Sequence, residues 1–377
     1  MRRVIISTIG TSLLTNPISR DNVDEKYWYA SLRDMANQKW ENLSEEVKQI
    51  ITTLKERAIA QLEAGKIQTI RGASAELNGI YGIYQEELTQ GKEDIHYLIA
   101  TDTAQGFTTA EIVQTFLQQK GINNISIYTP SGLSTASTTD FSEGIDELIV
   151  WLQNQIPPLR KDYKIYFNLV GGFKSLQGYL NTIGMFYADE IIYIFEGVGS
   201  ELITIPRLPI AIDIAAIEPH TVKLALMDAG AGLPPEQVTD VPESLLGTFN
   251  DKRVLSTWGK LIWEQSKNKL LSQKLLEFPG IEYKDSFRGD YNQIKSQAER
   301  VKLQETLALV SCLLAQSNGD TSRLKTHGGV QYDKYENKGN MDHFRVTQGL
   351  RVSCTSAKGV LLLHRYGKEP DVNTNPW

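Results

Sequence analysis

The chain has 377 residues, of which 41% are hydrophobic and 22% are charged, and its formal net charge is −6. This composition is that of an ordinary globular protein, and the length predicts two or three domains. No stretch approaches the roughly 18 to 20 apolar residues of a membrane-spanning helix. The two cysteines, Cys312 and Cys354, are too few for a disulfide framework or a thiolate metal site. We therefore expect a cytoplasmic protein with no membrane partner, no metal and no cofactor.

Residues 1–205 alternate between short β-branched runs and longer segments with apolar residues at helical spacing. The predicted strands are Arg3–Ile9, Ile95–Ala100, Asn124–Tyr128, Lys164–Asn168 and Glu190–Phe195. The predicted helices are Glu45–Leu62, Ser74–Leu88, Thr108–Gln119, Phe141–Gln155 and Phe173–Tyr187. We interpret the polar and aromatic stretch Leu14–Asn42 as a helical insertion. Alternating strands and helices predict an α/β fold with a doubly wound parallel sheet, which binds ligands beyond the carboxyl ends of its strands.

Three segments rich in glycine and hydroxyl groups follow predicted strands of this sheet. Gly10-Thr11-Ser12 follows the first strand, Asp102 and Thr103 follow the second, and Gly171-Gly172 with Lys174 follow the fourth. Such turns present backbone N–H groups to an anion, and a lysine in the first turn of a helix adds positive charge there. Each segment alone could equally be a tight connection. No G-x-G-x-x-G follows the first strand, which disfavours a dinucleotide cofactor.

Three runs within this region carry a family resemblance. They are the opening VIISTIGTSLL, the stretch LIATDTAQG, and the run from Asn168 to Gly197, NLVGGFKSLQGYLNTIGMFYADEIIYIFEG. Together they resemble the CARF domains of CRISPR-associated proteins. The resemblance implies a Rossmann-like sensor that pairs into a homodimer and binds a cyclic oligoadenylate across the two-fold axis, with cyclic tetra-adenylate favoured over cyclic hexa-adenylate as allosteric activator. The positions that match ligand-facing residues are Gly10, Thr11, Ser12, Asp102, Thr103, Gly171, Gly172 and Lys174.

Some CARF domains also cleave their own activator. That reaction uses a ribose 2′-hydroxyl as the nucleophile and needs positioning and charge stabilisation from the protein. The resemblance implies that Ser12 and Lys174 could supply both. Binding without cleavage is the alternative.

Residues 206–278 depart from the alternating pattern. Pro206, Pro209 and Pro219 break the apolar run after the last predicted strand, and Val254–Leu271 mixes apolar with basic residues. We interpret this segment as a small connector, either helical or winged-helix-like. A winged helix would favour a transcription regulator that binds DNA through its basic residues. Those residues are Arg253, Lys260, Lys267 and Lys269.

Residues 279–377 predict an α+β domain with a basic sheet. The predicted elements are an extended piece at Ile281, a helix from Tyr291 to Gln316, and strands at Val330–Tyr332, Phe344–Cys354 and Val360–Arg365. From Gly280 onward the chain holds 14 Lys and Arg against 11 Asp and Glu, and the last strands interleave few acids. Because residues two apart share a face of a strand, we expect His343, Arg345 and Arg351 on one face. That face would either bind an RNA backbone or simply be solvated.

Gly349-Leu350-Arg351-Val352 on the middle strand and Gly367-Lys368 after the last strand resemble the RelE family of ribosome-dependent mRNA interferases. The resemblance implies metal-independent cleavage, in which arginines stabilise the phosphorane and an acid protonates the leaving 5′-oxygen. The residues placed in this site are Arg345, Arg351, His364, Arg365 and Lys368. The sequence departs from the family at Glu369-Pro370, where an arginine is usual, and no tyrosine follows Tyr366. The general acid is therefore left open among His364, Arg365 and Tyr366.

A CARF sensor, a winged-helix-like connector and a RelE-like domain, in this order, resemble the CRISPR-associated mRNA interferases of type III CRISPR antiviral defence. The predicted domains are 1–205, 206–278 and 279–377. The leading hypothesis is a metal-independent endoribonuclease that is activated by a cyclic oligoadenylate and cleaves mRNA on the ribosome. The alternatives are a DNA-binding regulator that responds to the same ligand, and a ring nuclease whose C-terminal domain only stabilises the dimer.

Overall fold

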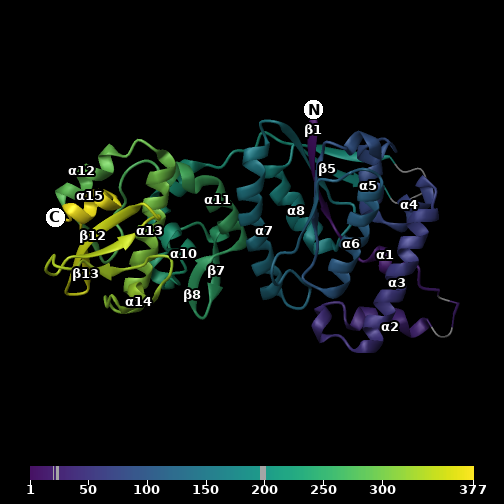
Figure 1. Ribbon diagram of the computed structural model, residues 1–377, viewed down its shortest axis with the longest axis horizontal. Helices are drawn as coiled ribbons and strands as arrows, with labels where there is room; N and C mark the ends of the chain where they lie inside the picture. Colours follow the sequence, from purple (N-terminus) through teal and green to yellow (C-terminus); the bar gives the residue numbers. More distant parts are fainter. Residues whose placement is uncertain (20, 23–24, 196–200) are drawn as a thin grey trace. The chain divides into compact units, whose positions relative to one another are not determined.

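The computed structural model describes residues 1–19, 21–22, 25–195 and 201–377. Glu196 and Gly197, which end the third run of the CARF resemblance, lie outside the described residues. The chain divides into two compact units, unit 1 (Met1–Ile210) and unit 2 (Ala211–Trp377), both drawn in Figure 1. Each unit has its own hydrophobic core. In the described ranges no helix is both long enough and apolar enough to cross a membrane.

Unit 1 is built on a six-stranded sheet in the order β3-β2-β1-β4-β5-β6. The strands are β1 (Arg2–Thr8), β2 (Ile95–Ile99), β3 (Ile125–Tyr128), β4 (Tyr163–Asn168), β5 (Glu190–Ile194) and β6 (Leu202–Pro206). β1 to β5 are parallel, which confirms the predicted parallel sheet, and β6 pairs antiparallel with β5. β6 is not predicted from the sequence because a proline argues against a strand. The strand order changes direction between β1 and β4, and the loops after these two strands meet where such sheets bind ligands.

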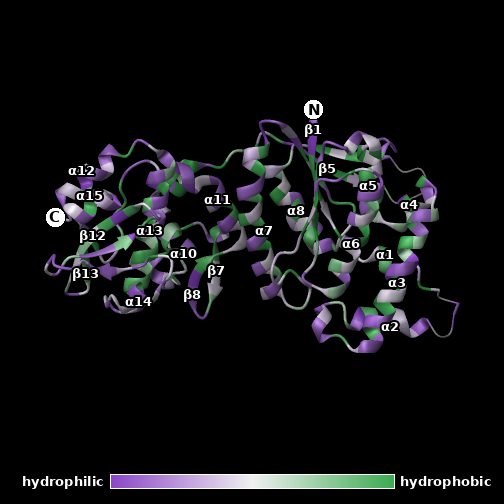
Figure 2. Ribbon diagram, in the orientation of Figure 1, coloured by the Kyte–Doolittle hydropathy of each residue, from purple (hydrophilic) through white to green (hydrophobic). Residues whose placement is uncertain are grey.

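Helices cover both faces of this sheet (Figure 1). They are α1 (Ser12–Thr15), α2 (Lys26–Asp34), α3 (Glu45–Ala64), α4 (Ile67–Ala73), α5 (Ala75–Ile83), α6 (Ala104–Gln119), α7 (Thr138–Leu159) and α8 (Lys174–Tyr187), with 3₁₀ helices at Trp40–Asn42 and Leu88–Gly91. α3, α5 and α6 pack on the face that carries Ile5 and Leu98. α7 packs Trp151 against Tyr97 and Tyr128 on the opposite face. Figure 2 shows β1 beginning hydrophilic and continuing hydrophobic, as a central strand covered on both sides requires.

Several helical segments of unit 1 differ from their predicted extent. α5 ends at Ile83 rather than Leu88, and α7 runs from Thr138 to Leu159 rather than from Phe141 to Gln155. α6 begins at Ala104 rather than Thr108, because the Thr103 hydroxyl accepts a hydrogen bond from Gly106 N (3.1 Å) and caps the helix. In the predicted insertion Leu14–Asn42, residues 20, 23 and 24 lie outside the described residues. The described part contains α2 and the 3₁₀ helix, with extended or turn residues between them.

Unit 2 has a five-stranded sheet in the order β10-β11-β12-β13-β9 and a separate hairpin of β7 and β8. The strands are β7 (Leu246–Phe249), β8 (Lys252–Leu255), β9 (Ile281–Tyr283), β10 (Asp333–Lys334), β11 (Asp342–Arg345), β12 (Leu350–Ala357) and β13 (Val360–Lys368). The helices are α9 (Ile214–Ile217), α10 (Thr221–Asp228), α11 (Thr257–Leu271), α12 (Asp285–Gln293), α13 (Gln297–Gln316), α14 (Ser322–Thr326) and α15 (Glu369–Thr374). β13 pairs in parallel with β9, and the other neighbours in this sheet are antiparallel.

Unit 2 differs from the sequence prediction at three places. The predicted helix Tyr291–Gln316 is in fact two helices, because α12 ends at Gln293 and Ser296 caps α13. The predicted strand Phe344–Cys354 is wrong as one element, since β11 and β12 form a hairpin there. The predicted strand Val330–Tyr332 lies just before the short strand β10.

The predicted connector and the predicted C-terminal domain share one hydrophobic core. Trp263 of α11 is 1% exposed and lies in the same cluster as Phe287 of α12 and Phe344 of β11. A domain boundary falls where few contacts cross, and a shared core leaves no such place. The structure therefore has two compact units, and a division at 205/206 and 278/279 stays a prediction.

Candidate functional site

The loops after β1 and β4 lie against each other at the carboxyl edge of the sheet in unit 1. The Thr8 hydroxyl donates a hydrogen bond to the carbonyl of Gly171 (2.6 Å). A Cβ atom added at Gly10 would lie 3.0 Å from the backbone nitrogen of Gly172, so the two backbones nearly touch. Gly172 has φ +88°, a conformation that side chains rarely adopt. The structure thus brings the predicted glycines of the first and third segments together.

A buried glutamate that the sequence reasoning missed holds these two loops. Glu76, in the first turn of α5, has no exposed surface, and its carboxylate accepts hydrogen bonds from Gly10 N (2.5 Å) and the Ser74 hydroxyl (2.7 Å). A Cβ atom added at Gly171 would lie 2.2 Å from the same carboxylate. The only local signal is a serine two residues before an acid at a helix start, a common pattern at helix N-termini. That signal indicates a helix start and not a site.

Lys174 and Ser12 are two polar side chains at this edge without a partner in the described ranges. Lys174 is the first residue of α8, and its exposed ammonium forms no ion pair with a described residue. No side chain caps α8, so the amides of its first turn can bind an anion. The Ser12 hydroxyl oxygen is buried yet has no hydrogen-bond partner in the described ranges. We call Gly10, Thr11, Ser12, Gly171, Gly172 and Lys174 the glycine site.

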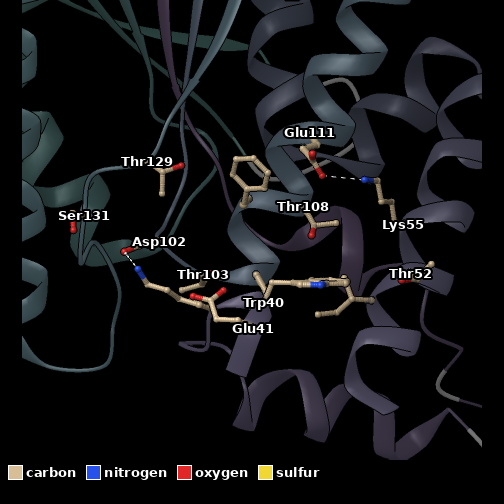
Figure 3. Close-up of a pocket in the computed structure, with 14 residues that line it drawn as sticks. Trp40, Glu41, Thr52, Lys55, Asp102, Thr103, Thr108, Glu111, Thr129 and Ser131 are labelled. Carbon is tan, nitrogen blue, oxygen red and sulfur yellow. Dashed lines mark hydrogen bonds and ion pairs between the residues drawn. The ribbon is translucent and has the colours of Figure 1, made fainter. Parts of the chain in front are cut away.

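Asp102 and Thr103, also predicted to face the ligand, already have structural partners. Asp102 accepts a hydrogen bond from Gly132 N (2.9 Å) and forms an ion pair with Lys39 (2.8 Å). The Thr103 hydroxyl caps α6. Both residues line a cavity of about 810 Å³ beside α3 and α6, shown in Figure 3, whose lining includes no residue of the glycine site. The three predicted segments therefore form two separate places.

The predicted basic face of unit 2 is formed by β11 and β12 together. Arg345 of β11 and Arg351 of β12 are directly opposite each other in the hairpin. Opposite residues of an antiparallel pair share a face, so the two arginines are neighbours across strands rather than along one strand. Phe344 and Val352 point to the hydrophobic core from the other face. The expected juxtaposition is present, although the reason given for it from the sequence is wrong.

The C-terminal segment, Glu369–Trp377, covers this face. The Arg351 side chain is 1% exposed and forms an ion pair with Glu369 of α15 (3.0 Å). Its guanidinium also donates to the carbonyl of Thr347 (3.0 Å). The Ser353 hydroxyl donates to the carbonyl of Pro376 (2.6 Å), so the segment reaches across β12. The acids that the basic strands lack are thus supplied from outside the strands.

His343 and Tyr335 lie beside the two arginines. Their rings are stacked with centroids 4.4 Å apart. Burial lowers the pKa of His343, and the charge of Arg351 lowers it further. The imidazole is therefore neutral near pH 7 and can accept a proton. Burial raises the pKa of Tyr335 to about 12, which keeps its hydroxyl protonated. The sequence places His343 on this face without a role and gives no signal for Tyr335, which lies outside the predicted strands.

Two other predicted residues of this site lie on β13. Arg365 is held by Asp290 of α12 through its Nε (2.8 Å) and Nη2 (3.2 Å) atoms. Lys368 is opposite Leu350, whose side chain packs on the core side of the sheet. Lys368 therefore leaves the sheet on the face opposite to that of Arg351. Arg365 is opposite Ser353 and therefore shares the face of Arg351, although Asp290 holds its guanidinium. Lys368 is the residue that the structure does not bring to the arginine pair.

His364 is the extra residue of a β-bulge in β13. Its Nε2 lies 2.9 Å from the Thr355 hydroxyl, and its ring is 6.1 Å from the ring of Trp377. Burial lowers the pKa of His364, and the charge of Lys284 acts in the same direction. This histidine is also neutral near pH 7, and the end of the C-terminal segment partly covers it.

Residues 71–208 match the family described as CRISPR-associated protein (Cas_APE2256). The match supports the interpretation of this chain as a CRISPR-associated protein, and it suggests a part in CRISPR defence. The matched region runs from α4 to just beyond β6 and includes Asp102, Gly171 and Lys174. Gly10 and Ser12 precede it, and unit 2 follows it, so the match concerns most of unit 1 and not the basic face.

The basic residues of the predicted connector are largely neutralised by acids. The pairs are Arg253 with Glu243 (2.6 Å), Lys260 with Asp228, and Lys267 with Glu264 (2.9 Å). A recognition helix needs free cations to bind DNA phosphates. Of the four predicted basic residues, Lys269 is exposed near the end of α11. These ion pairs give the DNA-binding alternative little support.

Proposed function

We propose that this CRISPR-associated protein is an endoribonuclease activated by a cyclic oligoadenylate, with cyclic tetra-adenylate as activator and ribosome-bound mRNA as substrate. The observation that carries the proposal is the cross-strand pair of Arg345 and Arg351 beside the neutral His343. In the same chain, the glycine site offers amides and an ammonium group to an anion. The CARF resemblance implies that unit 1 binds the activator, and the RelE resemblance implies that unit 2 cleaves the RNA.

Unit 1 is the proposed sensor, and it would act as a homodimer. A cyclic tetra-adenylate is a symmetric polyanion, and two copies of one site on a two-fold axis match such a ligand. Lys174 would contact a phosphate directly, and the amides of the first turn of α8 would add to the attraction. The Ser12 hydroxyl is unpartnered but buried, so it would donate to the ring once the loop after β1 exposes it.

Unit 2 is the proposed nuclease, and its residues can be given roles without a metal. His343 takes the proton of the ribose 2′-hydroxyl, and the 2′-oxygen attacks the adjacent phosphorus. The bond to the 5′-oxygen breaks, which leaves a 2′,3′-cyclic phosphate and a free 5′-hydroxyl. Tyr335 donates a proton to that leaving oxygen. Arg345 and Arg351 stabilise the negative charge that develops on the phosphorane.

The C-terminal segment supports a regulated nuclease. The Glu369 carboxylate pairs with the Arg351 guanidinium (3.0 Å), where the substrate phosphate would have to bind. Cleavage therefore requires Glu369–Trp377 to leave the face. A ligand shifts such an equilibrium only by binding one state better than the other. We infer that the activator favours the state in which this segment is displaced.

The nuclease assignment is tested with Arg345→Ala in a ribosome-containing cleavage assay with cyclic tetra-adenylate. Arg345 is exposed, so its removal spares the ion pair of the buried Arg351 with Glu369. Loss of one such charge-stabilising group should reduce the cleavage rate about 100- to 1000-fold. The control is Arg323→Ala, which removes an exposed arginine of α14. Full activity of Arg345→Ala would overturn the placement of the active site.

The sensor assignment is tested by the affinity for cyclic tetra-adenylate. Lys174→Ala should raise the Kd about tenfold or more, because a charge-assisted contact contributes about 1.5–3 kcal/mol. Lys161→Ala is the matched control, since Lys161 is an exposed lysine that precedes β4 while Lys174 follows it. Equal affinities of the two variants would remove the glycine site from ring recognition.

A second candidate activity is slow cleavage of the ring by unit 1. The buried, unpartnered Ser12 hydroxyl favours it, because it could orient a ribose 2′-hydroxyl toward the phosphate that Lys174 neutralises. The protein would be incubated with cyclic tetra-adenylate and the products resolved by mass. Linear products that vanish in Ser12→Ala support this activity, whereas an intact ring excludes it.

A further inference from the structure

The cavity beside α3 and α6 is a feature of unit 1 that the proposed function does not use. It has a volume of about 810 Å³, which is within the range of small-molecule sites. Its wall comes from the start of α6, the first half of α3, the 3₁₀ helix Trp40–Asn42 and the loop after β3. The glycine site contributes no residue to the wall.

Two large aromatic rings line this cavity and remain exposed. Trp40 is 43% exposed and Phe107 is 46% exposed. They come from segments far apart in the sequence, the 3₁₀ helix and the first turn of α6, yet they border one space. Exposed aromatic rings that line a cavity provide stacking surfaces for a flat ligand, and every nucleobase has such a π-face.

The charges of the cavity argue against a phosphate ligand. Lys39 is paired with Asp102 (2.8 Å), and Lys55 is paired with Glu111 (3.0 Å), as the dashed lines in Figure 3 show. Both cations are therefore already neutralised within the wall. The remaining charged group is Glu41, so the wall carries one carboxylate in excess. An anion would gain nothing here, unlike at the glycine site with its free ammonium.

The remaining polar groups suit the edge of a base and a ribose. Thr108, Thr129 and Ser131 line the wall with hydroxyl groups that can donate or accept. The Thr52 hydroxyl already donates to the carbonyl of Lys48 (2.9 Å) and can only accept. Figure 3 shows all four around the same space. The Glu41 carboxylate can accept hydrogen bonds from an exocyclic amino group. Stacking rings, hydroxyls and one acceptor without a free cation describe a neutral, flat, amino-bearing ligand.

We propose that this cavity is a second binding site of unit 1, and that it takes the base of a purine nucleoside between the Trp40 and Phe107 rings. The site goes beyond the proposed function, because it recognises a base rather than a phosphate and shares no residue with the glycine site. The base could belong to a free nucleoside or to one nucleotide of a larger oligoadenylate. The two sources share the same chemistry at the cavity.

The test is titration calorimetry of the full chain with adenosine, AMP and cyclic tetra-adenylate in separate arms. Adenosine should bind, and AMP should bind no more than about threefold more tightly, because no free cation is present to contact its phosphate. Trp40→Ala and Phe107→Ala should each raise the adenosine Kd about tenfold to a hundredfold, the range expected for loss of one stacking contact. Trp40→Phe should retain most of the affinity.

Tyr27→Ala is the matched control, since Tyr27 is a 47% exposed aromatic residue that does not line the cavity. No adenosine binding, or AMP binding far tighter than adenosine, would overturn the proposal. So would an unchanged adenosine Kd in Phe107→Ala, with a change in oligomeric state instead, because a second copy of the chain would then cover the rings. If cyclic tetra-adenylate binding is lost in Lys174→Ala but retained in Trp40→Ala, the base in the cavity belongs to a free nucleoside and not to the ring. Failure of ring binding alone leaves this site standing and removes only the sensor proposal.

Discussion

The glycine site of unit 1 and the basic face of unit 2 handle charge in opposite ways. At the glycine site the acid, Glu76, is buried beneath the loops, while the cation, Lys174, is exposed without an ion-pair partner among the described residues. On the basic face the cation, Arg351, is buried and an acid covers it. The first arrangement is ready for an anion, whereas the second is occupied by the chain's own carboxylate. The comparison indicates that the anion-binding groups of unit 1 are preformed, whereas the basic face of unit 2 is closed.

Gly171→Ala should have the largest effect, because it disturbs the contact between the glycine site and the Glu76 carboxylate beneath it. The new Cβ would lie 2.2 Å from the Glu76 carboxylate. Overpacking of this kind destabilises by about 1–3 kcal/mol, and any relief must move the loop that forms the glycine site. We expect cyclic tetra-adenylate binding to be lost and the urea midpoint of unit 1 to fall.

Gly178→Ala is the control for this substitution. Gly178 is exposed within α8, and nothing lies within 4 Å of its added Cβ. Replacing a helical glycine by alanine should instead stabilise the fold by about 0.5–1 kcal/mol, with ring binding unchanged. If both variants bind the ring equally well, the glycine site is not as tightly built as its geometry indicates.

Glu369→Gln should have the next largest effect, because it loosens the closed site. The substitution keeps the shape of the side chain but removes the charge that faces Arg351. Since a hydrogen bond between charged groups contributes about 1.5–3 kcal/mol, the open state should gain about tenfold or more in population. Cleavage of ribosome-bound mRNA without activator should rise accordingly.

Asp371→Asn is the matched control for the closed site. Asp371 lies on the same helix, α15, and is exposed, and the charge change is identical. Only Glu369→Gln should raise cleavage in the absence of the ring. A lower thermal stability of Glu369→Gln without any gain in basal cleavage would mean that the ion pair serves the fold alone.

The sequence predicts the local part of the glycine site and misses what holds it. Gly10, Gly171 and Lys174 are found because each follows a β-branched strand within a few residues, and a parallel sheet brings strand ends to one edge. Glu76 is missed because it reaches Gly10 from 66 residues away and from a helix whose sequence signals only a cap. Asp102 is placed with the ligand by its position after β2, but Lys39, from the insertion, pairs with it.

Unit 2 is predicted less well because its site depends on pairings between distant residues. The β11–β12 hairpin is taken for one strand, since the turn residues Thr347-Gln348-Gly349 lack the Asn-Gly or Pro signal of a tight turn. Arg351 is expected on an open face because nothing in its strand shows that Glu369 folds back over it. The parallel sheet of unit 1, by contrast, follows from alternating hydrophobic periods that are local in the sequence.

Acidification should give the smallest of these effects, a loss of stability that is larger in unit 1 than in unit 2. His96 of β2 is fully buried, and this burial lowers its pKa from 6.5, the usual value for histidine, to about 3. Its Nε2 lies 2.9 Å from the Tyr84 hydroxyl, which donates to Asp94, and its Nδ1 has no hydrogen-bond partner in the described ranges. Below pH 6.5 the unfolded chain binds a proton that the folded chain does not, so stability falls as the pH falls. Between about pH 7 and pH 5.5, unit 1 should lose about 1 kcal/mol of its free energy of unfolding.

The measurement is hydrogen–deuterium exchange of peptides from β1 and β2, corrected for the intrinsic exchange rate at each pH. His96→Gln should remove the acid-dependent part of the loss, because glutamine can still hydrogen-bond to Tyr84 through its side-chain amide but does not titrate. His343 is the comparison in unit 2. Its pKa is also lowered by burial, but it is only partly buried, so His343→Gln should change the pH dependence of β11 and β12 less. A protection of β2 that does not vary with pH in the unsubstituted protein would show that the buried imidazole is protonated in place, with Asp94 close enough to stabilise the charge.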